Sequence, residues 1–337
     1  MTRLVMKPKI YVARAVFDDV LARLREHFEV SDNTSDQVGT PAELSARLVG
    51  RVGAFITGSE RIDAALLDAH PQLKAVCNMA VGYNNIDVPA CTARGVLATN
   101  TPDVLTETTA DFGFALMMAT ARRIAESERY LRRGEWTKWS YDMFTGSDIH
   151  GATLGVLGMG RIGQAIARRG ALGFGMKVVY HNRSRLDAAT EAELGARYVD
   201  KETLLREADH LVLVLPYSSA SHHAVGAAEL ALMKPTATLT NIARGGIVDD
   251  AALAAALARG QIAAAGLDVF EGEPALNPAL LNVPNVVLTP HIASASVATR
   301  RAMANLAADN LIAALGFGPN AGRPPTPTNP EVLKRPG

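Results

Sequence analysis

Hydrophobic and polar positions divide the first hundred residues into short apolar runs separated by stretches with helical periodicity. Short apolar runs bounded by turn residues are typical of buried strands, and the amphipathic stretches between them are typical of helices. The expected strands are residues 9–13, 53–57, 73–77 and 96–99, and the expected helices include residues 18–28 and one with Pro41 in its first turn. This alternation predicts a small α/β domain with a parallel sheet.

The next such unit contains a glycine-rich turn. An apolar run over residues 154–157 leads into Gly158-x-Gly160-x-x-Gly163, a helical pattern follows, and a second apolar run covers residues 178–180. In a strand, turn, helix, strand unit the first glycine allows the turn, the second lets backbone approach a pyrophosphate, and the third lets the helix lie close to the strand. Glycine turns also join ordinary strands and helices, but this complete context predicts dinucleotide binding.

The end of the second strand bears on the choice of dinucleotide. Enzymes that use NAD usually place an Asp or Glu there to accept the ribose 2′-hydroxyl, whereas an Arg accommodates the 2′-phosphate of NADP. The segment reads His181-Asn182-Arg183-Ser184-Arg185, which contains two guanidinium groups and no carboxylate. We therefore predict a preference for NADPH, with NADH as a possible second cofactor, and contacts from Arg183 and Ser184 to the phosphate. The alternative is a solvated turn with incidental charge.

Apolar runs at residues 210–215, 236–242, 263–269 and 286–289, with a helix over 251–259, extend the doubly wound pattern. The last three runs end in charged or titratable residues, namely Arg244, then Asp268 with Glu271 and Glu273, and finally His291. Because parallel strands end at one edge of their sheet, these side chains should converge on the cofactor crevice.

Domain boundaries follow from the remaining helices. Thr101-Pro102-Asp103 interrupts the first pattern and starts a helix to about residue 123, while the final helix (297–315) and tail (316–337) are too short for another domain. We expect a doubly wound Rossmann nucleotide domain over 101–291 and a smaller, discontinuous α/β domain over 1–100 and 292–337.

Composition restricts the possible partners. The 337 residues have zero formal net charge, so nothing indicates binding to nucleic acid or to an anionic membrane. We find no signal-peptide pattern and no long apolar span, and therefore expect a cytoplasmic protein. Cys77 and Cys91 are isolated, without CxxC spacing, so we expect reduced structural thiols and no metal site.

Reduction of a carbonyl by hydride transfer requires a proton donor for the carbonyl oxygen. His291 is the best candidate for this acid/base role because histidine titrates near neutral pH, although a single histidine is more often structural. A neighbouring Glu273 carboxylate would stabilise the charged imidazolium. Arg244 can pair with a substrate carboxylate through two parallel hydrogen bonds, a task for which Lys is a poor substitute.

Two further segments have open interpretations. Residues 79–87 form a loop at the carboxyl end of a strand, where Gly82 would let amides approach a small anion or simply form a turn. Trp136, Trp139, Tyr141 and Phe144 form an aromatic cluster just before the dinucleotide unit. This cluster fits an arm packed on a partner subunit, a lid over the site, or ordinary hydrophobic packing.

The motifs AVGYNNID, GMGRIG, NIARGGIVD, GLDVFEGEP and TPHIASA together resemble the D-isomer-specific 2-hydroxyacid dehydrogenases across nearly the whole chain. The HNRS segment is most similar to the bacterial glyoxylate/hydroxypyruvate reductases of this family, a group that includes 2-ketogluconate reductases. The resemblance implies a flavodoxin-like substrate domain, a Rossmann domain and a homodimer formed through the nucleotide domains.

The resemblance also implies roles for individual residues. Arg244 would anchor the substrate, Glu273 and His291 would form the acid/base pair, and the amides of Val81 and Gly82 would bind the substrate carboxylate. Asp268 would lie near the nicotinamide, whose pocket Ile242 and Ala243 would line. The full set of expected cofactor contacts is Gly158, Gly160, Arg161, Ile162, Gly163, Asn182, Arg183, Ser184, Leu215, Pro216, Ile242, Ala243, Asp268 and His291.

Differences between this sequence and other members of the family restrict the expected substrate. Family members that oxidise formate have Gln in place of the Glu of the pair, so Glu273 argues against formate, and the chain has no room for the regulatory domain of many phosphoglycerate dehydrogenases. Ala293 replaces a common Gly, and its methyl group could tighten the nicotinamide side of the cleft. We expect NADPH-dependent reduction of a small 2-oxo acid, glyoxylate or hydroxypyruvate first, with a larger acid such as 2-ketogluconate as the alternative. A dinucleotide-sensing corepressor is the alternative of another class.

Overall fold

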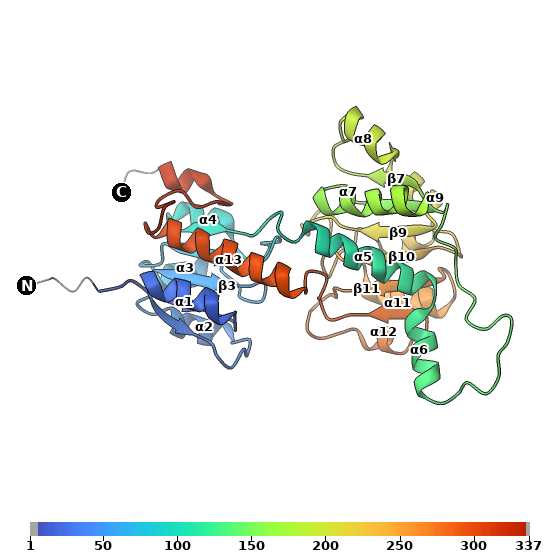
Figure 1. Cartoon of the computed structure of the whole chain (residues 1–337), viewed down its shortest axis with the longest axis horizontal. Helices are drawn as coiled ribbons and strands as arrows, with labels where there is room; N and C mark the ends of the chain where they lie inside the picture. Colours follow the sequence, from blue (N-terminus) through green and yellow to red (C-terminus); the bar gives the residue numbers. More distant parts are fainter. Residues whose placement is uncertain (1–5, 335–337) are drawn as a thin grey trace, which may run out of the picture. The chain divides into compact units, whose positions relative to one another are not determined.

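The computed structural model describes residues 6–334, which form two compact units (Figure 1). Unit 1 contains the residues up to Leu105 together with those from Ser296 on, and unit 2 is Thr106–Ala295. Both units are built from parallel strands alternating with helices, so the chain has the expected α/β fold. Among the described residues, no helix has the length and apolar character needed to cross a membrane.

Unit 1 has a five-stranded parallel sheet in the order β2-β1-β3-β4-β5, the order of flavodoxin-like folds. Helices α1 and α13 cover one face of this sheet, and α2, α3 and α4 cover the other. The elements are β1 (Lys9–Val12), α1 (Asp18–His27), β2 (Glu29–Asp32), α2 (Pro41–Leu48), β3 (Gly53–Ile56), α3 (Ala64–Ala69), β4 (Ala75–Asn78), α4 (Val88–Ala93), β5 (Leu97–Thr99), α13 (Val297–Ala314) and the 3₁₀ turn η2 (Pro330–Lys334).

Unit 2 has a seven-stranded parallel sheet in the order β12-β11-β10-β9-β6-β7-β8, which is the doubly wound Rossmann order with one added strand. Apolar cores fill both faces, one beneath α5, α7 and α8 and the other beneath α9 to α12. The elements are α5 (Thr106–Ala121), α6 (Ile124–Arg132), β6 (Thr153–Leu157), α7 (Arg161–Arg168), the π-helical turn η1 (Arg169–Gly173), β7 (Lys177–His181), α8 (Ala188–Leu194), β8 (Ala196–Tyr198), α9 (Lys201–Glu207), β9 (His210–Leu213), α10 (Ala227–Leu230), β10 (Thr238–Asn241), α11 (Asp250–Ala258), β11 (Ala264–Leu267), α12 (Pro278–Leu281) and β12 (Val286–Leu288).

The observed units have slightly different boundaries from the predicted domains. Unit 2 runs from Thr106 to Ala295, whereas the predicted nucleotide domain covers residues 101–291. Residues just after β5 are held in unit 1, since the Thr101 amide donates to the carbonyl oxygen of Ala80. The chain tail also belongs to unit 1, where the Thr328 amide donates to Ala98 and the side chain of Asn329 accepts from the Ala98 amide.

Candidate active site

Three neighbouring strands of unit 2 bring the predicted acid/base and anchoring residues together. Strands β10, β11 and β12 are adjacent and parallel, so the loops that follow them leave the same edge of the sheet. Arg244 follows β10, Glu273 follows β11, and His291 follows β12. The parallel topology therefore brings these three residues, which are far apart in the sequence, to one edge of the sheet.

His291 and Glu273 form a hydrogen-bonded pair. Nδ1 of His291 lies 2.8 Å from Oε2 of Glu273, and Oε1 of Glu273 accepts from the Phe270 amide at 2.8 Å. Because a carboxylate only accepts hydrogen bonds, this contact places the proton on Nδ1 when the imidazole is neutral. Nε2 of His291 has no hydrogen-bond partner among residues 6–334, and the side chain is 47% exposed. Nε2 is therefore available to a substrate.

The pKa of Glu273 reflects opposing contributions. Burial raises it, but the hydrogen bonds from His291 and the Phe270 amide, together with the positive charge of Arg244, outweigh burial. The pKa of Glu273 consequently lies below its ordinary value. The carboxylate is ionised at neutral pH and can stabilise a positive charge on the imidazole.

Asp268 fixes the turn that carries His291. The Asp268 side chain is completely buried, and its carboxylate accepts from the Thr289 hydroxyl at 2.7 Å and from the amides of Ile292 and Ala293 at 2.9 and 2.8 Å. Burial raises the pKa of Asp268 even though these three donors favour ionisation. His291 itself has a φ of 55°, a left-handed conformation that is uncommon for residues other than glycine. Asp268 thus positions His291, and its contact with a nicotinamide stays a prediction.

Arg244 lies in a tightly held loop next to Glu273. The buried Asn241 accepts from the Ala243 amide at 3.0 Å and donates to the Arg244 carbonyl at 3.3 Å, which closes the loop on itself. A Cβ at Gly245 would lie only 1.7 Å from the carbonyl oxygen of Phe270, so only glycine allows this approach. Burial lowers the pKa of Arg244, and the charge of Glu273 opposes that shift. A guanidinium in this position stays charged and can bind a carboxylate.

The glycine motif meets the geometric requirements of a pyrophosphate-binding turn. Gly158 has a φ of 103°, and a Cβ there would lie 2.7 Å from the Leu215 amide nitrogen. A Cβ at Gly163 would lie 2.4 Å from the carbonyl oxygen of Gly158, whereas nothing lies within 4 Å of the corresponding position at Gly160. Helix α7 starts after Gly160 without a side-chain cap, which leaves its first N–H groups for an anion. These residues therefore fit a dinucleotide.

The two arginines of the segment after β7 have different surroundings. Arg185 is paired with the buried Glu191 at 2.6 and 2.8 Å, and the hydroxyl of Tyr180 also donates to Glu191. Arg183 and Ser184 are exposed and make no hydrogen bond or ion pair with any described residue. Asn182 accepts from the Met159 amide at 2.6 Å, so its side chain holds the glycine-rich turn.

The other expected cofactor contacts lie around this turn. Arg161 and Ile162 begin α7, and Leu215 and Pro216 follow β9 beside Gly158. The side chain of Ile242 instead packs in the core against Gly113 of α5, and Ala243 belongs to the core on the other face. Contacts from these two residues to a nicotinamide remain a prediction. Because both side chains lie in the cores, main-chain atoms would make such contacts.

In unit 1, the predicted anion loop follows β4. The side chain of Asn78 donates to the Gly82 carbonyl at 3.0 Å, and Asn100 donates to the Val81 carbonyl at 2.8 Å. Within the described part of unit 1, the amides of Val81 and Gly82 donate no hydrogen bond. They are thus available to an anion, as the prediction requires.

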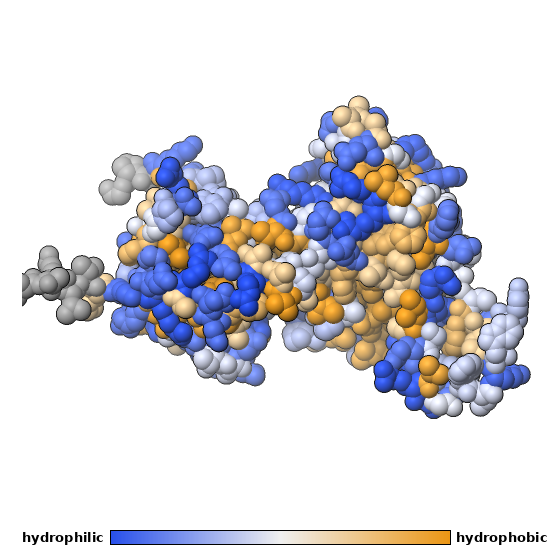
Figure 2. All heavy atoms as spheres, viewed as in Figure 1, coloured by the Kyte–Doolittle hydropathy of each residue, from blue (hydrophilic) through white to orange (hydrophobic). Residues whose placement is uncertain are grey.

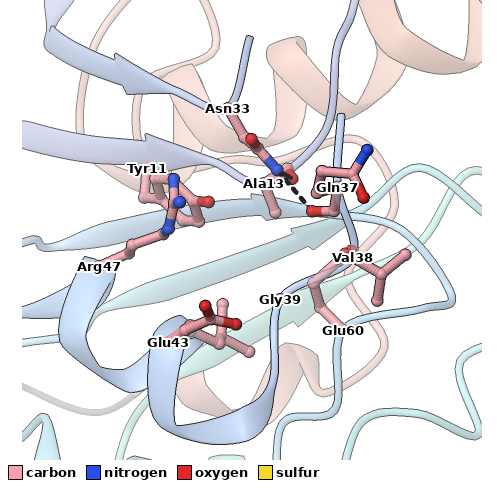
Figure 3. A pocket seen from close by; sticks show the side chains of 10 residues that line it. Tyr11, Ala13, Asn33, Gln37, Val38, Gly39, Glu43, Arg47 and Glu60 are labelled. Carbon is pink, nitrogen blue, oxygen red and sulfur yellow. Dashed lines mark hydrogen bonds between the residues drawn. The ribbon is translucent and has the colours of Figure 1, made fainter. Parts of the chain in front are cut away.

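Unit 1 also contains a separate cavity of about 270 Å³ near α2 (Figure 3). Its wall includes Tyr11, Asn33, Glu43 and Arg47, and Asn33 donates to the carbonyls of Ala13 and Gln37. None of the predicted site residues lines this cavity, so it is distinct from the strand-end site of unit 2.

Comparison with known proteins agrees with this geometry. The family model described as the NAD-binding domain of D-isomer-specific 2-hydroxyacid dehydrogenases matches residues 114–293. The chain belongs to this dehydrogenase family. Its members are oxidoreductases, and the nucleotide domain of this dehydrogenase binds a nicotinamide dinucleotide.

Relatives of this dehydrogenase are similar over nearly their whole length. A glyoxylate reductase of Thermococcus gammatolerans is 48% identical over 98% of both chains, and a glyoxylate/hydroxypyruvate reductase B of Klebsiella pneumoniae is 48% identical over 92% of this chain and 96% of its own. The structure of an NADPH-dependent glyoxylate/hydroxypyruvate reductase of Sinorhizobium meliloti, in complex with NADP and malonate, has a TM-score of 0.85. It is 38% identical and covers 98% of this chain and 99% of its own.

Several residues that hold the site in place are not marked by any sequence motif. Asn241 and the Tyr180–Glu191–Arg185 cluster have no motif that marks them, because a polar residue in an apolar run can face solvent or the core. The expected contact of Asp268 with the cofactor stays a prediction, and the structure adds its hydrogen bonds to residues 289–293. A carboxylate directly after a buried strand was the available signal for such a role.

Proposed function

We propose that this dehydrogenase is an NADPH-preferring reductase of small 2-oxo acids, with glyoxylate and hydroxypyruvate as the first candidates. The observation that carries the proposal is the His291–Glu273 pair at 2.8 Å, close to the guanidinium of Arg244. The names of relatives that are 48% identical over more than nine tenths of the chain support the choice of substrates.

The site residues have complementary tasks in this reaction. When bound, the nicotinamide supplies the hydride that reaches the carbonyl carbon. Arg244 binds the substrate carboxylate and polarises the adjacent carbonyl group. His291, charged beside Glu273, donates a proton from Nε2 to the carbonyl oxygen. The amides of Val81 and Gly82 in unit 1 are proposed contacts of the substrate carboxylate.

The preference for NADPH is supported by the end of β7. No carboxylate is present in residues 181–185 to accept a ribose 2′-hydroxyl, and the exposed guanidinium of Arg183 makes no ion pair with a described residue. An available guanidinium and a hydroxyl at Ser184 suit a 2′-phosphate.

We also propose a homodimer formed through unit 2. Trp136, Trp139 and Tyr141 are 54%, 72% and 90% exposed, in the long loop between α6 and β6 that extends from unit 2 (Figure 1). Half-buried apolar residues of α5 lie on a face of unit 2 rich in apolar side chains (Figure 2). Aromatic residues this exposed are typical of protein interfaces, which favours an arm on a second copy over internal packing.

A panel of 2-oxo acids, assayed with both nicotinamide cofactors, tests the proposal. We expect the highest kcat/KM with glyoxylate or hydroxypyruvate and NADPH, and a fall in turnover of about 100-fold or more for His291→Asn. A preference for 2-ketogluconate would favour the larger-substrate alternative. Absence of NADPH oxidation with every 2-oxo acid would favour a dinucleotide-sensing role, and a fully active His291→Asn variant would contradict the acid/base assignment.

A further inference from the structure

A second cluster of chemically active side chains lies in unit 2, outside the catalytic residues. His222 and His223, in the segment between β9 and α10, meet Glu271, which follows β11. One ligand atom from each of the three residues lies within 4.8 Å of the others. We propose that His222, His223 and Glu271 form a binding site for a divalent transition metal ion such as Zn²⁺.

Hydrogen bonds position both histidines of the cluster. The His223 amide donates to the Gly246 carbonyl at 2.7 Å, and Nε2 of His223 lies 3.0 Å from Oε2 of Glu271. The hydroxyl of Tyr217 lies 3.1 Å from Nδ1 of His222 and so orients that ring. A hydrogen bond to the ring atom that does not bind the metal is usual at metal sites. The Tyr217 hydroxyl would have this part for His222, whereas the His223–Glu271 contact joins two of the proposed ligands.

The carboxylate side of the cluster is anchored as well. The Glu271 amide donates to Oδ2 of Asp250 at 3.0 Å, and Asp250 is buried. Asp249 adds negative charge, with Oδ2 3.9 Å from Nδ1 of His223. The backbone of the cluster is therefore fixed, while the exposed side chains of His222 and Glu271 can rotate.

The types of side chain in the cluster suit a metal ion. The two imidazole rings are stacked with centroids 3.9 Å apart. Two imidazoles and a carboxylate are a ligand set that Zn²⁺ accepts, with a fourth position left for water.

The required movement is small. Ligand atoms about 2.1 Å from a tetrahedral metal lie about 3.4 Å from one another. Starting from separations within 4.8 Å, rotation of the exposed His222 and Glu271 side chains by about one ångström closes the site. No sequence motif indicates this metal site, because Glu271 lies far along the chain from the histidine pair.

Titration of the full chain, untagged and freed of metal by a chelator, tests the proposal directly. Calorimetry should show one Zn²⁺ bound per chain, and Co²⁺ should produce the visible absorption of a four- or five-coordinate ion. His222→Ala and Glu271→Gln should each weaken Zn²⁺ binding by about 10-fold or more, as loss of a ligand does. Thermal unfolding without metal verifies that the variants are folded.

Two control variants give the experiment its specificity. His150→Ala removes an exposed histidine elsewhere in unit 2 and should leave Zn²⁺ binding unchanged. His291→Asn should also retain binding, because the proposed site does not include the His291–Glu273 pair. Equal Zn²⁺ affinity in wild type, His222→Ala and Glu271→Gln would overturn the proposal, as would loss of binding only in His291→Asn or no binding to the wild type.

Discussion

Removing Arg183 tests the cofactor assignment most directly. Arg183→Ala would remove the predicted charge-assisted hydrogen bond to the 2′-phosphate, and such a loss costs about 1.5–3 kcal/mol. That range corresponds to an increase of about 10-fold to 150-fold in the Michaelis constant for NADPH. Because Arg183 is exposed, screening by salt places the expected effect towards the lower end. The Michaelis constant for NADH should change by less than a factor of about two, since no charged partner is lost.

Arg185→Ala is the matched control, since it removes the same side chain two positions away. Arg185 is paired with the buried Glu191, so its loss should lower the melting temperature and leave the NADPH to NADH ratio nearly unchanged. Initial rates at saturating 2-oxo acid, with each cofactor varied in turn, measure the effect. An equal loss with both cofactors in Arg183→Ala, or a larger NADPH-specific loss in Arg185→Ala, would refute the assignment.

Two further predictions concern the strand ends that hold the proposed catalytic residues. Because the folded-state pKa of Glu273 is lowered, this group stabilises the folded chain above the ordinary glutamate pKa, and the stabilisation is lost as pH falls through the lowered value. Glu273→Gln should therefore flatten the acid side of the melting temperature against pH, and an unchanged profile would contradict the cited shift. Gly245→Ala should reduce kcat/KM by about 100-fold or more by displacing Arg244. Gly173→Ala, where nothing lies within 4 Å of the added Cβ, is its control, and equal activity of both variants would contradict the argument.

The sequence predicted most of the fold because the central strands of both sheets are buried on both faces. Strand β9, for example, is fully buried, and all its residues after His210 are apolar. Strands β2 and β8 were missed because they lie at sheet edges, where their residues are mostly half-buried or exposed and show no apolar run. The pattern thus predicts elements in proportion to their burial.

The candidate site was predictable to the level of residue type and strand end. Gly158, Gly160 and Gly163 have the three geometries that their spacing indicates. The difference between Arg183 and Arg185 could not be read from the sequence, since it depends on the buried Glu191 of α8 that pairs with only one of them. Pairings of this kind depend on which side of an element faces inward.

The geometry of the His291–Glu273 pair requires more than the order of the strands. Adjacent β11 and β12 bring Glu273 and His291 to one edge, but a 2.8 Å hydrogen bond demands a defined backbone at each loop. The Asp268 carboxylate supplies it by binding three donors of the turn that holds His291 in its left-handed conformation. Burying this carboxylate costs stability, which its raised pKa reflects, and a strained residue persists only where its surroundings hold it. The chain therefore keeps a buried carboxylate, with a pKa raised by burial, at the place that holds His291, the proposed proton donor.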